Sequence, residues 1–126
     1  MVVLVKKQFY NVGMNSYESG LFAEFMAKMY LRMHGFHIVK SRYITGRNTG
    51  RAEIDIIARR HNLMIFVEVK RRPNVDTAWA AITPKQSLRL RRAAEGFVAK
   101  TNWNGDARFD AILVCGLHVY WARGAL

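Results

Sequence analysis

The sequence lacks several features that would place it in other classes of protein. Its 126 residues include one cysteine and two prolines, so it can form no internal disulfide and contains no proline-rich linker. Cys115 lies in the apolar run 111–115, where a buried structural thiol is expected rather than a nucleophile. No apolar run approaches the roughly 20 residues of a membrane-spanning helix. The apolar start at residues 2–5 precedes its charges and is too short for a secretory signal, so we expect a cytoplasmic protein without a membrane partner.

Acidic residues are also scarce. Nine Asp and Glu stand against twenty Lys and Arg, which leaves a formal charge of +11. Such an excess costs self-repulsion in the folded state and is typical of a protein whose partner is a polyanion, with nucleic acid as the first candidate. The hydrophobic fraction of 51% is sufficient for a core. We expect a single domain over residues 16–126, preceded by an N-terminal arm or edge strand over residues 1–15.

The first predicted element is a helix that Ser16 caps and Gly35 ends. Large apolar residues at helical spacing predict the face that packs on the core: Leu21, Phe22, Phe25, Met26, Met29, Tyr30 and Met33. Glu24 lies on the other side among small and apolar neighbours. A carboxylate is unusual in that setting, so Glu24 is a candidate functional residue.

The remaining pattern predicts a mixed α/β sheet. Strands are expected at residues 36–43, 53–59 and 63–71, the last two forming a hairpin that turns at 61–62. A second helix begins with Thr83 and Pro84 and turns Leu90, Ala94, Phe97 and Val98 inward. Strands at 108–115 and 117–121 follow, joined at Gly116. The order helix, three strands, helix, two strands predicts a central mixed sheet of about five strands flanked by helices.

The expected hairpin brings acidic residues together. A turn at 61–62 places Asp55 opposite Glu68. The same register places Glu53 opposite Lys70. Alternation along a strand puts these four side chains on one face. The other face then carries Ile54, Ile56, Val67 and Val69.

Carboxylates that face one another on a sheet repel, and a bound cation removes the conflict. Oxygen donors favour Mg²⁺ or Mn²⁺ over zinc, and the chemistry that such an ion serves is phosphodiester hydrolysis. Lys70 beside the acids can orient a hydroxide or stabilise negative charge. The plainer alternative is a cross-strand ion pair of Glu53 with Lys70 on a solvated sheet face. Against it, three of the nine acids fall on this patch.

Several segments resemble the YraN-like family of uncharacterised predicted endonucleases. The resemblance covers roughly residues 20–115. It rests on Ala23-Glu24, Ala27, Tyr30-Leu31, Gly35-Phe36, residues 53–58, residues 66–70, Lys85 and Arg108-Phe109-Asp110. It implies a restriction-endonuclease-like fold, similar to archaeal Holliday-junction resolvases, with the Asp…Glu-x-Lys signature of metal-dependent nucleases.

Carried over by position, the resemblance implies that Asp55 and Glu68 are catalytic metal ligands and that Lys70 is the catalytic lysine. Glu24 is implied as the helix carboxylate that joins the metal site, and the main-chain carbonyl of Val69 as a further ligand. The implied ion is Mg²⁺ or Mn²⁺. Resolvase-like relatives also imply a homodimer. The substrate implied is DNA rather than RNA, including structured or branched DNA.

Two positions depart from the family pattern, because Ala23 and Ala52 stand where the family has Gly before Glu. The Ala52 departure keeps an alternative open: a non-catalytic nucleic-acid-binding protein that retains the nuclease fold. A structural subunit that binds an acidic protein is a third possibility. For phosphate contacts we single out the basic residues near the acids and on the second helix. They are Arg51, Arg71, Arg72, Lys85, Arg89 and Arg92.

Overall fold

The computed structural model describes residues 14–46 and 51–126. The N-terminal arm or edge strand expected over residues 1–15 therefore falls almost entirely outside the described residues. The elements, in chain order, are α2 (Ser16–Met33), β1 (His37–Thr45), β2 (Ala52–Arg60), β3 (Leu63–Arg71), α3 (Val75–Ala80), α4 (Pro84–Thr101), β4 (Asp106–Cys115) and β5 (His118–Ala122). The predicted order is confirmed, with the six-residue helix α3 as an addition.

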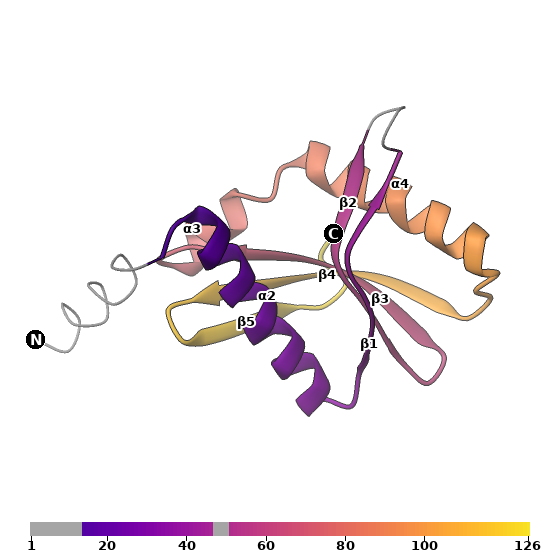
Figure 1. The fold of residues 1–126 in the computed structure, drawn as a ribbon, viewed down its shortest axis with the longest axis horizontal. Coiled ribbons are helices and arrows are strands. Elements are labelled where there is room, and N and C mark those ends of the chain that lie inside the picture. The colour runs from indigo at the N-terminus through magenta and orange to yellow at the C-terminus, as the bar shows by residue number, and fades with distance from the viewer. Residues whose placement is uncertain (1–13, 47–50) are drawn as a thin grey trace, which may run out of the picture.

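The five strands form one mixed sheet in the order β1-β2-β3-β4-β5 (Figure 1). Strands β3 and β4 are parallel, and every other neighbouring pair is antiparallel. The connection between the parallel strands contains α3 and α4, since parallel neighbours need a crossover. The α/β class and the mixed sheet are confirmed.

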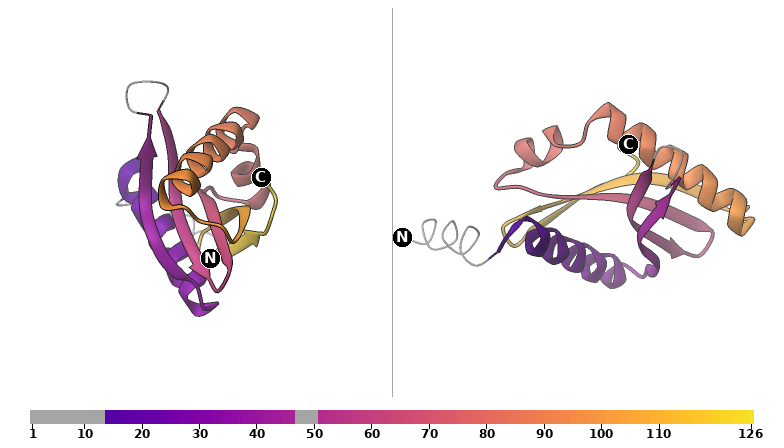
Figure 2. Two further views of the ribbon diagram at one scale, coloured as in Figure 1. Left: turned by 90° about the vertical axis from the view of Figure 1, so that its right-hand side faces the viewer. Right: turned by 45° about the horizontal axis from the view of Figure 1, so that its top comes forward.

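Helices cover both faces of this sheet, as the right-hand view of Figure 2 shows. Helix α2 lies on one face over a core that includes Ile56, Val67 and Ile112. Helix α4 lies on the other face over a second core, which it joins through Leu90, Ala94 and Phe97, as expected. The short α3 packs through Ala78 against Ala111 and Leu113 of β4. None of the helices in the described parts of the chain is both long and apolar enough to cross a bilayer.

The starts of α2, α3 and α4 are all capped by side chains. Thr83 and Gln86 form a reciprocal capping box at the start of α4, with Pro84 at its first position, as predicted. The predicted cap of α2 is wrong by one residue: Asn15 Oδ1 accepts a 2.8 Å hydrogen bond from the Glu18 N–H, and Ser16 is the first helical residue. Asn and Ser are equally good caps, so sequence alone did not distinguish them.

Helix α2 packs with the face opposite to the one predicted. Its small side is buried, with Ala23, Ala27 and Leu31 at 3%, 0% and 0% exposure, whereas Phe25 and Met33 are exposed. Alanines at the contact let the helix backbone approach the sheet closely, which bulky side chains would prevent. The prediction that the large apolar residues form the core face is therefore wrong for Leu21, Phe25, Met29 and Met33, whereas Met26 does pack against the core.

The β2–β3 hairpin has the predicted register, with Arg60 paired to Leu63, but the paired ladder ends at Ile56 and Val67. On the other side of β2, Ser41 and Tyr43 of β1 pair with Ile56 and Ile54. Arg42 lies between them and has a left-handed φ of 52°. Ile54 packs in the α4 core and Ile56 in the α2 core. The predicted shared face is thus wrong for Ile54, since the distortion around Asp55 interrupts the alternation.

Candidate metal and nucleic-acid site

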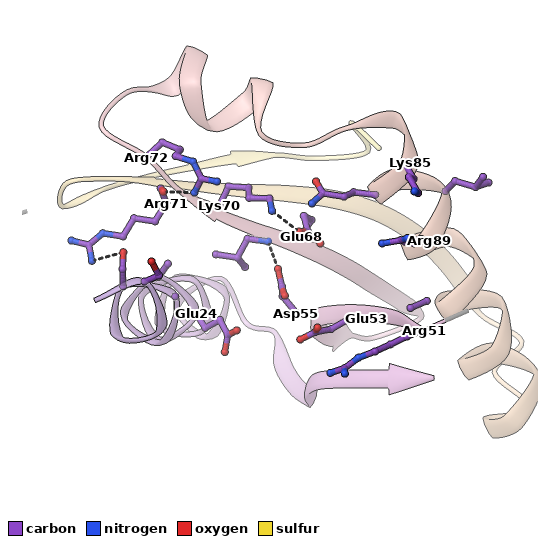
Figure 3. Close-up of a pocket in the computed structure, with 18 of the residues that line it drawn as sticks. Glu24, Arg51, Glu53, Asp55, Glu68, Lys70, Arg71, Arg72, Lys85 and Arg89 are labelled. Atoms are coloured by element: carbon purple, nitrogen blue, oxygen red, sulfur yellow. Dashed lines mark hydrogen bonds and ion pairs between the residues drawn. The ribbon is translucent and has the colours of Figure 1, made fainter. Parts of the chain in front are cut away.

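A cleft of about 1210 Å³ opens where β2 parts from β3. Residues of α2, β2, β3 and α4 line it. Figure 3 shows Glu53, Asp55 and Glu68 near its middle, Glu24 at the side of α2, and basic residues around them. All the predicted site residues line the cleft: Glu24, Arg51, Asp55, Glu68, Val69, Lys70, Arg71, Arg72, Lys85, Arg89 and Arg92. Glu53 joins them. The cleft therefore combines an acidic centre with a basic border.

Asp55 lies half-buried in the cleft. Its Oδ2 accepts a 2.8 Å hydrogen bond from the Val69 N–H, so β3 holds the side chain just beyond the last backbone pair of the hairpin. Burial raises the pKa of Asp55 to about 8, and the charge of Glu68 adds to the effect while the Val69 N–H opposes it. A carboxyl in this state is the signature of uncompensated negative charge in a desolvated site.

Glu68 and Lys70 lie two residues apart on β3 and form an ion pair, with Lys70 Nζ 3.4 Å from Glu68 Oε1. Burial raises the pKa of Glu68, and the charge of Lys70 works against that rise. Lys70 thus makes this ion pair along its own strand rather than with Glu53 across the hairpin. The ammonium is half-buried at the side of the acids, within reach of a ligand in the cleft.

Glu24 reaches the cleft from α2 and is 9% exposed. Arg42 Nε donates to both of its carboxylate oxygens at 3.0 Å, and the same guanidinium lies over the ring of Tyr17. Sequence reasoning missed this partner, because 18 residues separate Arg42 from Glu24 and no periodicity connects a helix to a distorted strand. The left-handed backbone at Arg42 has no sequence signal either, since such a conformation favours Gly or Asn.

The basic residues of α4 lie as predicted, with Lys85, Arg89 and Arg92 along the cleft. At the opposite end of the cleft, Arg72 Nη1 donates to the carbonyl of Arg71 at 2.7 Å.

Arg71 is placed differently from the other basic residues. It is 7% exposed. Its guanidinium contacts Met14, donates to Ser19 Oγ at 3.3 Å and lies over the ring of Phe22. Arg71 therefore fastens the start of α2 to the sheet.

The donor set fits a hard divalent cation in type and in charge. Carboxylate oxygens from α2, β2 and β3 line one cleft, and the raised pKa of Asp55 reports negative charge that a cation would offset. As the side chains stand, no three Asp, Glu, His or Cys residues within 14–46 and 51–126 converge on one metal position. Glu24 would have to turn from Arg42 to complete the set.

The fold and cleft define an α/β protein with an acidic centre at the split of a mixed sheet and basic residues along the rim. The chain belongs to the uncharacterised protein family UPF0102, whose model matches residues 23–114. This confirms the YraN-like resemblance. The matched range contains all four acids of the cleft, together with Lys70.

Relatives cover most of the chain. A UPF0102 protein of Bradyrhizobium diazoefficiens is 42% identical over 101 residues, which span 79% of this chain and 73% of the relative. One from Paramagnetospirillum magneticum is 40% identical over 97 residues, 75% of each chain. One from Shewanella denitrificans is 36% identical over 110 residues, 84% of this chain and 96% of the relative.

Proposed function

We propose that this protein is a divalent-metal-dependent endonuclease that hydrolyses phosphodiester bonds in DNA, including structured or branched DNA. The observation that carries the proposal is the pair Asp55 and Glu68, half-buried together beside Lys70 in a cleft with basic residues on its rim. Half-buried carboxylates with raised pKa values suit a cation. The basic rim and the net charge of +11 suit a polyanionic substrate.

Asp55 and Glu68 would hold Mg²⁺ or Mn²⁺, joined by Glu24 and the main-chain carbonyl of Val69. Such an ion would polarise the phosphate and would lower the pKa of a bound water. The Val69 N–H fixes the orientation of Asp55, so one ligand is organised before any ion arrives.

The other residues of the cleft act on the substrate. Lys70 can hold the attacking water or stabilise the developing negative charge, because its ammonium is already kept beside Glu68. Lys85, Arg89 and Arg92 project from one side of α4 and would bind phosphates along the backbone. Their contacts would orient the scissile bond over the acids without reading the base sequence.

The test is a calorimetric titration with Mn²⁺ followed by cleavage assays on linear, nicked, flapped and four-way DNA. Wild type should bind Mn²⁺ and cut at least one substrate, whereas Asp55→Asn should lose both activities and keep its DNA affinity. A wild-type protein that binds each DNA but cuts none of them with Mg²⁺ or Mn²⁺ is not a nuclease.

One observation favours a second candidate function, a nucleic-acid-binding protein without catalysis. Both oxygens of Glu24 are engaged by Arg42, which leaves the acids separated rather than gathered round an ion. For this candidate, Mn²⁺ should not bind and Asp55→Asn should leave cellular function intact. Metal binding at Asp55 would exclude it.

A further inference from the structure

The outer face of α2 carries a continuous ridge of large apolar side chains, which we name the α2 ridge. Its members recur every four residues and are Tyr17, Leu21, Phe25, Met29 and Met33, exposed by 65%, 40%, 57%, 42% and 78%. They are five of the eleven large hydrophobic residues exposed in the described parts of the chain. They therefore form a patch, and an apolar patch on a protein surface commonly marks an interaction site.

We propose that the α2 ridge is the surface through which two copies of this chain pair, with α2 antiparallel to α2 about a twofold axis. Side chains spaced by four residues form the ridge that packs beside its own kind in the commonest class of helix contact, with the axes crossing at about −50°. A single surface of this kind is self-complementary, as a twofold interface requires. Antiparallel packing also sets opposite ends of the two helix dipoles together.

The size of the ridge is close to what a stable dimer needs. Its exposed apolar surface is on the order of 600 Å² per copy, given that a large side chain presents about 150–250 Å² when fully open. A standard interface buries about 800 Å² per partner. The partly buried Phe22 and Met26 flank the ridge and supply further apolar contact.

The charges beside the ridge suit an antiparallel arrangement. Phe25 is the middle member, so it meets its own copy at the twofold axis, while Tyr17 approaches Met33 of the other copy. Arg32 lies seven residues beyond the twofold axis and Glu18 seven residues before it, and both are exposed. The Arg32 of one copy therefore lies level, along the helix, with the other copy's Glu18. The two Arg32 side chains stay apart by about 21 Å along the helix.

Pairing through the α2 ridge also sets the relative orientation of the two clefts, and the use of that orientation for DNA rests on the proposed function. Glu24 and Gly20 line the cleft from one flank of α2. The twofold axis of an antiparallel helix pair is perpendicular to both helices and to the line that joins them. Rotation about this axis therefore leaves the same flank of α2 facing the same direction in both copies. Both clefts would then open toward one side of the dimer, where a duplex can lie across them.

Sedimentation equilibrium of the full chain over micromolar concentrations tests the pairing. Wild type should be a dimer, and Phe25→Glu should be a monomer with an unchanged circular dichroism spectrum, since Phe25 is 57% exposed. Leu117→Glu is the matched control: Leu117 is 67% exposed but lies between β4 and β5. It should remain a dimer. A monomeric wild type, or a dimeric Phe25→Glu, overturns the proposal.

Cross-linking with a short bis-maleimide then tests the geometry, with the buried Cys115 as background. Phe25→Cys should cross-link to itself. Tyr17→Cys should cross-link only when mixed with Met33→Cys. Self-linking of Met33→Cys would indicate parallel helices and would overturn the antiparallel arrangement. These measurements need no metal or DNA, so a dimer without cleavage would contradict the proposed function and leave the pairing intact.

Discussion

At the scale of single residues, the cleft is defined by carboxylates that the surrounding protein only partly compensates. Asp55 has one hydrogen bond from the Val69 N–H, and Glu68 has the ammonium of Lys70, yet burial raises the pKa of both carboxyls. Glu24 differs, because the guanidinium of Arg42 contacts both of its oxygens. The negative charge of Asp55 and Glu68 is thus only partly compensated, whereas Glu24 is already fully paired with Arg42.

The raised pKa of Asp55 predicts how stability depends on pH. The carboxyl has a pKa of 3.8 in the unfolded chain and about 8 in the folded protein. Between these values the folded state keeps a proton that the unfolded state has lost, so the free energy of unfolding should fall as pH rises. Denaturation in the presence of a chelator should show a lower value at pH 8 than at pH 5.

Asp55→Asn removes this titrating group. At pH 8 it should be more stable than wild type, by on the order of 2 kcal/mol, and should retain only the smaller slope that Glu68 contributes. A wild-type stability that is constant or rises over this range would contradict the burial of an uncompensated Asp55.

The Arg42–Glu24 contact predicts competition with a metal ion. Arg42→Gln should free Glu24 and strengthen Mn²⁺ binding several-fold, whereas Glu24→Gln should weaken it about tenfold or more. Arg51→Gln is the matched control, because it removes a positive charge from the cleft without breaking this contact. If Arg51→Gln strengthens binding as much as Arg42→Gln, the effect is charge alone. Calorimetry measures all four affinities.

At the scale of elements, α4 has one face that packs on the core and another that lines the cleft. Leu90, Ala94 and Phe97 pack into the core, while Lys85 and Arg89 line the cleft one turn apart. The helix begins at a capping box, which fixes its first turn and therefore the position of Lys85. Because the helix is already fixed, little conformational entropy is lost when these charged side chains bind a phosphate backbone.

Removing the charges of Lys85 and Arg89 should weaken DNA binding without affecting the fold. The double change to Ala should lower affinity similarly for every DNA sequence. It should also reduce the slope of log K against log salt by about 2, or about 1 per phosphate contact. Lys100→Ala on the same helix is the control, since Lys100 lies away from the cleft. Fluorescence anisotropy at several salt concentrations measures the slopes, and equal slopes would exclude these contacts.

Strand β4 contains the most completely bonded acid of the described chain, Asp110, which is 0% exposed. Its two oxygens accept bonds of 2.8–2.9 Å from Arg108, from the indole N–H of Trp121 and from the Gly124 N–H. Asp110 thus ties the end of the chain to β4. The Arg108-Phe109-Asp110 segment shared with the YraN-like family has a structural role here.

Asp110→Ala should therefore be strongly destabilising, because it leaves the partly buried Arg108 and the Trp121 N–H without their acceptor. We expect a loss of about 3 kcal/mol or more in the free energy of unfolding. Asp106→Ala, at the exposed start of the same strand, should cost under about 0.5 kcal/mol. Urea denaturation compares the two, and similar losses would rule out the anchoring role.

At the scale of the whole molecule, the cleft exists only because four elements meet. Helix α2 brings Glu24, strand β2 brings Asp55, β3 brings Glu68 and Lys70, and α4 supplies basic residues. An ion at this point would be held by groups from three elements, so it would bind the folded state and not the unfolded chain. Metal binding and global stability are then linked.

Mn²⁺ should accordingly raise the melting temperature of the whole protein. At a free concentration of about 100 times Kd the gain is about 2.7 kcal/mol, which corresponds to several degrees for a chain of this length. Calorimetric melting should show this shift in wild type and in Asp106→Asn, which keeps every acid of the cleft, but not in Asp55→Asn. An equal shift in Asp55→Asn would place the ion elsewhere.

The sequence by itself determined the features that depend on neighbouring residues. The turn at 61–62 and the pairing of Arg60 with Leu63 follow from two adjacent strands of period two. The cap at Thr83 and the inward face of α4 follow from local spacing. The acidic patch was found because its members lie on one hairpin. Helix α3 was missed, since six residues are too few to show a helical period.

Only the tertiary structure decided which face of α2 is buried, that Ile54 and Ile56 pack on opposite faces of the sheet, and that Arg42 binds Glu24. Each of these depends on segments that are distant in sequence and compete for the same space. The alanines of α2 contact the sheet because they allow the helix backbone to approach it closely. The large apolar residues of the α2 ridge remain on the surface. Periodicity identifies a two-sided helix, but close packing selects the side that is buried.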